Sequence, residues 1–183
     1  MLEEIATRIL PFIVAAGIPA MVVLFYAEGT IVGKVFQAPP IFIGYVSVTS
    51  PSTGRLLFLS TLCVLATVAG QWTVYRGFNT ESPEILGLQK RIPVLGTFPD
   101  ALDTRIGEKK MRFIENWFEK GGAVAIIVTN TIPVIRCLIA IPAGLNNYSR
   151  KKFLLATTVG NVIYTAILIG TAYGIGILTR LFF

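Results

Sequence analysis

Two charged residues stand within or beside long apolar stretches of this chain. Glu28 closes one charge-free run, and Arg136 separates two others. A charged side chain inside a membrane costs about 2.5–3.5 kcal/mol on insertion scales unless it is paired or hydrated. Asn130 and Thr131 precede Arg136 and add further polar side chains. The sequence therefore predicts a substrate- or ion-binding site made of Glu28, Asn130, Thr131 and Arg136.

The chemistry of this predicted site follows from its charged groups. Arginine stays charged, and its planar guanidinium can bind a carboxylate or a phosphate through two hydrogen bonds. Arg136 is thus a structural ion-pair partner, a contact for an anionic substrate, or both. Glu28 is either a carboxylate at a helix end near the membrane surface or a buried acid that faces the second broken segment. Further polar candidates are Lys34, Gln37, Gln71 and Asn161.

The composition indicates that most of the chain lies in a membrane. Hydrophobic residues make up 54% of the 183 residues and charged residues 14%, whereas a soluble domain carries about 25% charge. Mean hydropathy is +0.70. Charge-free runs long enough for a spanning helix of about 20 residues cover 9–27, 56–75 and 153–179. We predict an all-α integral membrane protein with about three full transmembrane helices.

Two further apolar regions are interrupted by proline and glycine. We predict that 28–52 and 121–149 are re-entrant helical hairpins, because neither region suits one continuous span. Backbone groups freed at such breaks need polar partners at membrane depth. The predicted hairpin breaks are Gly29, Gly33, Pro39, Pro40, Pro133, Pro142 and Gly144.

The basic residues predict the orientation of the chain. The loop 76–120 carries eight of the 16 basic residues, and three more follow at 150–152. Basic residues concentrate in cytoplasmic loops. If both hairpins return to their own side, the N-terminus and the loop 76–120 are cytoplasmic. We predict that the protein lies in the plasma membrane. The two hairpins then enter the bilayer from opposite faces.

We predict a single membrane domain, 1–183, built of two halves. The first half, 9–77, holds a span, a hairpin and a second span. The second half, 121–183, holds a hairpin and the last span. The polar connector 78–120 is predicted to end in an amphipathic helix in the membrane interface. Halves whose hairpins oppose each other are typical of inverted-repeat transporters.

Several function classes receive no support from the residues. The chain has no histidine, and its two cysteines lie in apolar runs without metal-ligand spacing. We therefore expect neither an enzyme nor a bound metal or cofactor. The net charge of +6 sits beside membrane segments, so attraction to anionic lipid headgroups explains it better than nucleic acid does. The oligomeric state stays open.

The second half contains a set of motifs at defined spacing. The set comprises Phe-Glu-Lys-Gly-Gly at 118–122, Asn-Thr-Ile-Pro-Val-Ile-Arg at 130–136, Ile-Pro-Ala-Gly-Leu at 141–145, and Phe153, Gly160 and Tyr164. In the first half, Glu28, Gly70 and Tyr75 add to it. With these motifs the chain resembles the DedA family, whose members carry the VTT, or SNARE-associated, domain.

Three positions depart from the family pattern. Asn130 stands where the family has the first arginine of R-F-x-P-x-x-R, Gln71 replaces an acid after Gly70, and the acid of the second turn of the first hairpin is missing. An acid and a base are thus lost together from the hairpins. We predict that Glu28 and Arg136 remain as a pair.

The resemblance implies lipid transport between the two hairpins. The cargo would be a polyprenyl phosphate carrier or a phospholipid, moved as by a flippase or scramblase, with possible proton coupling at Glu28. Membrane lipids and their phosphate headgroups would then be the partners. Two alternatives remain open: a proton-coupled small-ion or cation transporter that uses Glu28, and a non-transporting protein that organises the membrane.

Overall fold

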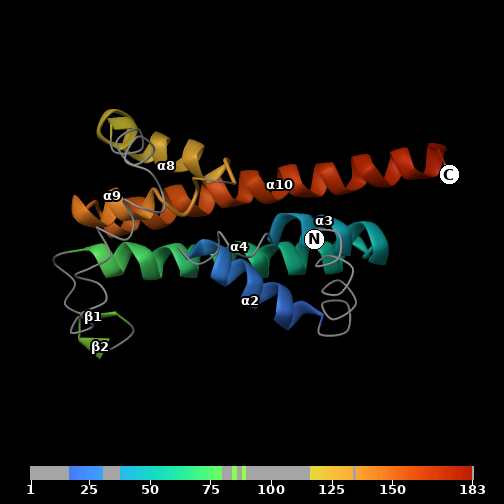
Figure 1. The fold of residues 1–183 in the computed structure, drawn as a ribbon, viewed down its shortest axis with the longest axis horizontal. Coiled ribbons are helices and arrows are strands. Elements are labelled where there is room, and N and C mark those ends of the chain that lie inside the picture. Colours follow the sequence, from blue (N-terminus) through green and yellow to red (C-terminus); the bar gives the residue numbers. More distant parts are fainter. Residues whose placement is uncertain are drawn as a thin grey trace, which may run out of the picture.

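The architecture is helical in a computed structural model that describes residues 17–30, 38–79, 84–85, 88–89, 116–133 and 135–182. The helices are α2 (Ile18–Gly29), α3 (Ala38–Thr49), α4 (Thr53–Phe78), α8 (Ala123–Asn130), α9 (Ala140–Leu145) and α10 (Arg150–Phe182), as Figure 1 shows. Residues 116–121 are helical as well. The strands β1 (Glu84–Ile85) and β2 (Leu88–Gln89) pair antiparallel, with Glu84 opposite Gln89. Each strand has only two residues, and the architecture is otherwise helical, in agreement with the predicted all-α class.

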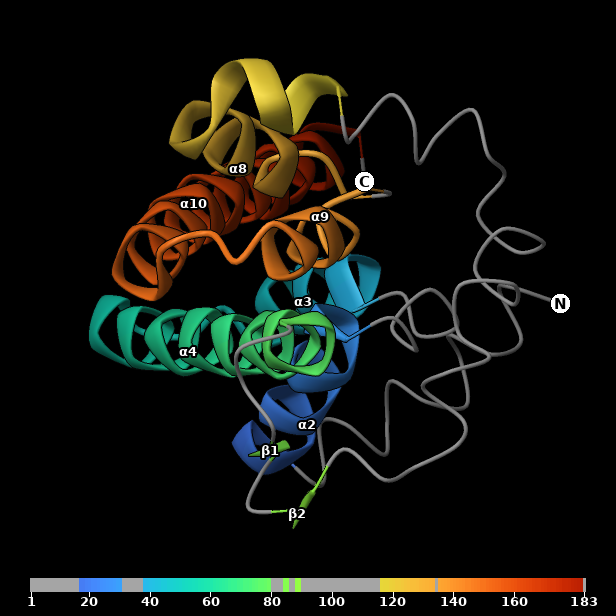
Figure 2. The same cartoon turned by 90° about the vertical axis from the view of Figure 1, so that its left-hand side faces the viewer.

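Two long helices, α4 and α10, run antiparallel and side by side (Figures 1 and 2). Both are long and apolar enough to cross a membrane, over Thr53–Phe78 and Arg150–Gly174. The 26 residues of α4 rise about 39 Å at 1.5 Å per residue, more than the ~30 Å of a hydrocarbon core. The predicted spans 56–75 and 153–179 lie within these helices, in agreement with a helical membrane protein.

The helix in the first predicted span, 9–27, begins later in the structure than the sequence predicts. α2 begins only at Ile18, because Gly17 has a φ of 62° that no helix contains. Pro19 occupies the first turn, where its missing N–H costs no hydrogen bond. The 12 residues of α2 rise about 18 Å, too little for a full crossing. Residues 9–16 lie outside the described part of the chain.

The short helices contact the long helices in an exchanged order. α2 packs on α4, whereas α3, its successor in sequence, packs on α10. α8 packs on α10, whereas α9 packs on α4. Figure 2 shows α8 covering α10 and α2 lying beside α4. Each short-helix pair therefore places one arm on each long helix, and the same two long helices position both pairs.

The buried residues form two apolar clusters with a polar layer between them. One cluster includes Val74 and Tyr75 of α4 with Phe153 and Ala156 of α10. The other includes Met21, Phe25, Phe42, Leu59 and Cys63 with Tyr164 and Leu168 of α10. Between the clusters lie the buried polar residues Thr67 and Gln71 on α4 and Thr157 and Asn161 on α10. Since the long helices are antiparallel, their polar positions meet at the same level.

The predicted hairpin breaks fall at different places in the fold. Gly29 ends α2, and Pro133 lies in the turn between α8 and α9, as a break should. The prediction was wrong for Pro39 and Pro40, which lie in the first turn of α3, where proline fits.

It was also wrong for the second proline–glycine pair, because Pro142 and Gly144 lie inside α9. Gly144 packs there against α4: a Cβ added to it would stand 2.6 Å from the carbonyl oxygen of Tyr75. Its small size therefore serves helix packing rather than a break. Gly33 lies outside the described residues.

The part of the connector predicted to be an amphipathic helix is described only at its end. Within the predicted amphipathic helix, which includes 103–120, residues 116–120 are helical in the structure. Phe118 is buried and meets Tyr148 edge-on, with ring centroids 5.3 Å apart, while Trp117 is exposed. The buried and exposed aromatic neighbours agree with an amphipathic helix end; residues 90–115 lie outside the described part.

Gly160 allows α10 to approach α8 closely, so a larger side chain at this position should destabilise the fold. A Cβ at Gly160 would stand 2.6 Å from Asn130 Cβ and 2.8 Å from the Ile127 carbonyl oxygen. We expect Gly160→Ala to lower the free energy of unfolding by about 1–3 kcal/mol, the usual cost of overpacking. Unfolding in detergent measures this loss. Gly170→Ala is the matched control on α10, because a Cβ there meets no atom within 4 Å; equal losses in both variants would contradict the packing argument.

Candidate functional site

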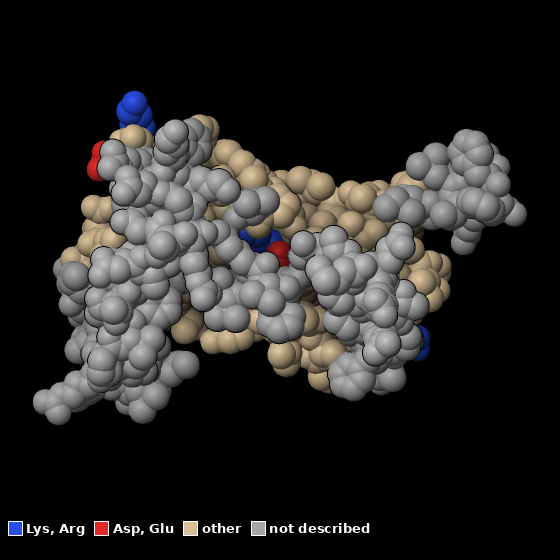
Figure 3. All heavy atoms as spheres, in the orientation of Figure 1, with Lys and Arg blue, Asp and Glu red and all other residues tan. Residues whose placement is uncertain are grey.

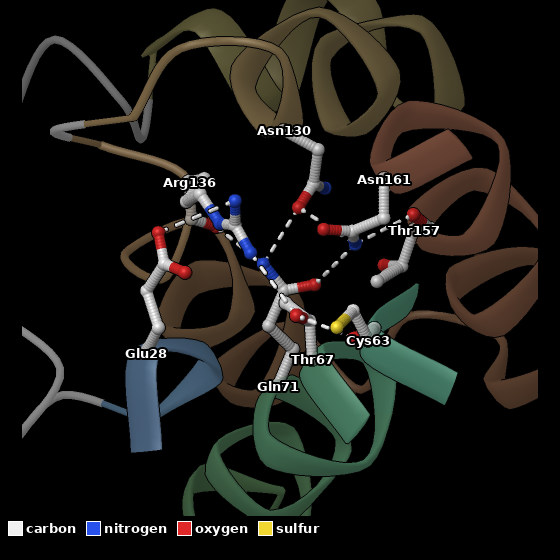
Figure 4. Close-up of polar contacts among 8 residues, drawn as sticks. All are labelled: Glu28, Cys63, Thr67, Gln71, Asn130, Arg136, Thr157 and Asn161. Carbon is white, nitrogen blue, oxygen red and sulfur yellow. Dashed lines mark hydrogen bonds and ion pairs between the residues drawn. The ribbon is translucent and has the colours of Figure 1, made fainter. Parts of the chain in front are cut away.

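A buried arginine occupies the centre of the candidate site. Arg136 lies in the turn between α8 and α9 and is 1% exposed. Its Nη2 donates to Thr67 Oγ1 of α4 at 3.2 Å, and its guanidinium carbon lies 4.4 Å from the centroid of the Tyr164 ring of α10. The Thr67 hydroxyl in turn donates to the Cys63 carbonyl at 3.0 Å. Figure 4 shows Arg136 meeting Thr67, and Thr67 meeting Cys63, which both come from a separate helix, α4.

Glu28 supplies the opposite charge. It is the penultimate residue of α2 and 7% exposed, and its Oε1 lies 3.4 Å from Arg136 Nη1. Glycines at two points allow α2 to bring it there: Cβ atoms at Gly29 and Gly70 would collide with the backbones of α4 and α2 respectively. The structure thus places Glu28 and Arg136 next to each other, as the sequence predicts.

Three side-chain amides join the long helices beside the ion pair. Gln71 Nε2 donates to Asn130 Oδ1 at 2.6 Å and to the Arg136 carbonyl at 3.0 Å. Asn161 Nδ2 donates to Gln71 Oε1 at 3.0 Å. Asn130 Nδ2 is bound to the Ile126 carbonyl at 2.8 Å. This amide network, formed by Gln71, Asn130 and Asn161, connects α4, α8 and α10 without any charge.

Several polar atoms around Arg136 have no hydrogen-bond partner among the described residues. On Arg136 these are Nε and Nη1, and on Glu28 it is Oε2. The Asn161 Oδ1, Thr157 Oγ1 and Tyr164 hydroxyl groups are also buried without such a partner. Buried polar groups usually find partners in protein or ordered water. The group therefore has unused donors for an anion and unused acceptors for water or a protonated oxygen.

The apolar surroundings of the site strengthen the interactions between its charges. Lys, Arg, Asp and Glu atoms are sparse on the described surface in Figure 3, and a blue and a red group meet near its middle. The apolar clusters on both sides keep the local dielectric constant low, so each charge there interacts more strongly than it would in water. Breaking a buried pair by removing one partner typically costs about 3–5 kcal/mol. An incoming anion must therefore compensate for any separation of Glu28 from Arg136.

Among the described residues, the structure brings the predicted site residues together with one exception. Asn130, together with the secondary candidates Gln71 and Asn161, belongs to the amide network beside the ion pair. Thr131 does not: it is not buried, and its hydroxyl donates to the Val128 carbonyl at 2.7 Å, at the end of its own helix. A threonine directly after a helix can satisfy that helix's free carbonyls, and this local bond keeps Thr131 out of the site. Lys34 and Gln37 lie outside the described residues.

Three members of the site were not identified as binding residues from the sequence. Thr67 stands four residues before Gln71, Thr157 stands four before Asn161, and Tyr164 stands three after it. Residues three or four apart share one face of a helix. A polar stripe at this spacing in two apolar helices was the available signal, because intramembrane polar residues face the protein interior.

The amide network predicts a loss of stability for Gln71→Met. Methionine keeps the unbranched shape but removes three hydrogen bonds and leaves Asn130, Asn161 and the Arg136 carbonyl short of partners. We expect the free energy of unfolding to fall by about 1–3 kcal/mol. Thr61→Val is the control on α4, because the exposed Thr61 hydroxyl only bonds its own helix. Equal stabilities of wild type and Gln71→Met in detergent unfolding would contradict the network.

The ion pair predicts non-additive losses. Glu28→Gln and Arg136→Gln each leave one buried charge unpaired, so each should lower the free energy of unfolding by about 3–5 kcal/mol. The double variant leaves no unpaired charge and should lose clearly less than the sum of the two. The measurement is a double-mutant cycle by unfolding in detergent. Strictly additive losses would show that the two side chains do not interact.

The chain was compared with known proteins. No family model and no solved structure matches it. It is 29% identical over 166 residues to undecaprenyl phosphate transporter A of Staphylococcus aureus (strain NCTC 8325 / PS 47), a match covering 89% of this chain and 74% of that protein. Two Lactococcus lactis proteins named alkaline phosphatase-like protein match over 62 residues: the one from subspecies cremoris (strain MG1363) is 37% identical and the one from subspecies lactis (strain IL1403) 42%. These matches cover 34% and 33% of this chain, which spans 29% of each relative's length. Nearly the whole chain is thus similar to a protein named for lipid-carrier transport.

Proposed function

We propose that this chain transports a phosphate-bearing lipid carrier, of the polyprenyl phosphate type, across the membrane. The observation that carries the proposal is the buried Arg136. Its guanidinium is 1% exposed, yet Nε and Nη1 have no hydrogen-bond partner among the described residues. Nε is unused and Nη1 faces only Glu28 Oε1 at 3.4 Å. A fixed cation with N–H groups to spare suits the oxygens of a phosphate group.

The similarity to the staphylococcal protein supports this cargo. That protein is named as an undecaprenyl phosphate transporter, and the match runs over 89% of this chain. Its name supports a lipid phosphate as cargo rather than a soluble ion. The alkaline phosphatase-like relatives match over about a third of the chain, and we assign no phosphatase reaction to the site.

The proposed architecture is that of a DedA-like inverted repeat. α2 and α3 have 12 residues each, and α8 and α9 have eight and six, all shorter than a spanning helix of about 20 residues. Short-helix pairs that reach into the bilayer and return would form re-entrant hairpins. The exchanged contacts of the pairs with α4 and α10 support a two-fold relation between the halves. In this arrangement the polar layer lies at the level where the hairpins meet.

The charges suggest how cargo binding proceeds. In the empty site, Arg136 and an ionised Glu28 neutralise each other. A phosphate monoester carries about −1.5 to −2 charges at pH 7, so its arrival at Arg136 would leave an excess of negative charge beside Glu28. Uptake of a proton by Glu28 would relieve this repulsion. Cargo binding would thereby be coupled to a proton, and loss of that proton would restore the ion pair and release the phosphate.

The test is lipid movement in reconstituted liposomes. Labelled polyprenyl phosphate is incorporated, and its appearance in the opposite leaflet is followed with a reagent that does not cross the membrane. We expect Arg136→Ala to move the lipid at least tenfold more slowly than wild type, because a charge-assisted hydrogen bond contributes about 1.5–3 kcal/mol. Glu28→Gln should also slow it and remove its dependence on a proton gradient.

Glu119→Gln is the matched control, because Glu119 is exposed and lies outside the polar layer. It should transport like wild type. Equal rates for wild type and Arg136→Ala would overturn the proposal. Cation flux without lipid movement would instead support the small-ion transporter, and the absence of both would support a membrane-organising role.

A further inference from the structure

A cavity lies at the end of α4 opposite the predicted cytoplasmic connector. It has a volume of about 180 Å³ and is formed where the start of α2, the end of α3 and the start of α4 meet. Ile18, Pro51 and Phe58 give it apolar walls. Arg55 in its lining is 16 residues from Gln71, about 24 Å along the helix at 1.5 Å per residue. The cavity is therefore separate from the polar cluster around Arg136.

The polar groups of this cavity favour an anion. Among the described residues, its lining contains one charged side chain, Arg55, beside the polar Tyr45 and Thr49, and no acid. The Thr49 hydroxyl already donates to the Tyr45 carbonyl at 2.7 Å, so Arg55 and the Tyr45 phenol are the side-chain donors that remain. An exposed guanidinium beside apolar walls, with no acid in the described lining, attracts phosphate and carboxylate groups.

The start of α4 adds to this preference. Its N-cap residue, Ser52, makes no side-chain capping bond, and the first turn contains no acid. The backbone N–H groups of that turn are consequently available, and the helix dipole places partial positive charge there. At Gly54 no atom lies within 4 Å of the position of a Cβ, so an anion can approach the turn closely.

The size and surroundings of the cavity distinguish a lipid headgroup from a whole small molecule. Pockets that enclose small molecules measure about 300–1,000 Å³, well above this cavity. A headgroup would fill it, and an attached chain would have to leave along the surface. The exposed face of α4 provides the path, because Phe58 and Leu65 are 59% and 57% exposed and share one face of the helix.

We propose that this cavity is a docking site for the phosphate headgroup of a membrane lipid. Arg55 binds the phosphate, Tyr45 and the first turn of α4 donate to its oxygens, and the chain lies along Phe58 and Leu65. The site would hold the lipid at the membrane face before or after its passage through the polar layer. This inference rests on the proposed function for the identity of the lipid, and its binding test is independent of transport.

The experiment measures equilibrium binding of polyprenyl phosphate to the protein in maltoside detergent, which contains no phosphate. Arg55→Gln should weaken binding about tenfold, and Arg55→Lys, which keeps the charge, should recover part of it. The matched control is Arg76→Gln, which makes the same change near the other end of α4, outside the cavity. Arg55 is exposed, so these variants are expected to fold, and circular dichroism checks this.

A photoreactive polyprenyl phosphate locates the contact. In wild type it should label peptides within 45–59, and Arg55→Gln should lose this labelling while Arg136→Ala keeps it. Unchanged affinity and labelling in Arg55→Gln would overturn the proposal. An equal loss of affinity for polyprenol, which lacks the phosphate, would overturn the headgroup assignment, and competition by inorganic phosphate at equal concentration would overturn the lipid assignment. If Arg55→Gln weakens binding while wild type moves no lipid in liposomes, the docking site stands and the transport function fails.

Discussion

The burial of one guanidinium group constrains the rest of this structure. Arg136 sits between two apolar clusters and is 1% exposed, so its charge must be balanced within the protein. Glu28 balances the charge, Thr67 accepts one of its hydrogen bonds, and the ring of Tyr164 lies against its face. These three groups come from α2, α4 and α10. Because the buried charge of Arg136 needs these partners, one side chain holds three helices together at one point. The close contact of α2 with α4 at Gly29 and Gly70 brings Glu28 near Arg136.

The amide network solves a related problem without charge. Gln71 and Asn130 stand where the DedA-like pattern has an acid and a base, and in the structure they are hydrogen-bonded to each other at 2.6 Å. An acid without its base, or a base without its acid, would be an unpaired buried charge at this point. Two neutral amides avoid that cost and keep a hydrogen bond at the same place. The departure at Asn130 is therefore balanced by Gln71, rather than by the acid missing from the predicted first hairpin.

The sequence could predict those features that depend on residue type alone. Long charge-free runs predicted α4 and α10, and the cost of isolated membrane charges predicted the contact between Glu28 and Arg136. The sequence alone could not predict features that depend on where a helix starts. Pro39 and Pro40 begin α3 rather than interrupt it, because proline is tolerated in a first turn. The amide network could not be predicted either, since it depends on the register between antiparallel helices. Thr131 lies outside this network, because its hydroxyl donates to the Val128 carbonyl.

The two kinds of polar contact divide the site into a fixed part and an exchangeable part. Gln71 holds the Arg136 carbonyl, so the backbone of the turn is tied to α4. α2 is also held against α4, because Gly29 and Gly70 leave no space between the two backbones. Glu28 and Arg136, in contrast, meet through an ion pair at 3.4 Å, and each retains a polar atom without a partner among the described residues. The exchange of Glu28 for a phosphate that we propose at Arg136 would thus require only rotation of side chains, while the amide network and the glycine contacts keep the helices in place.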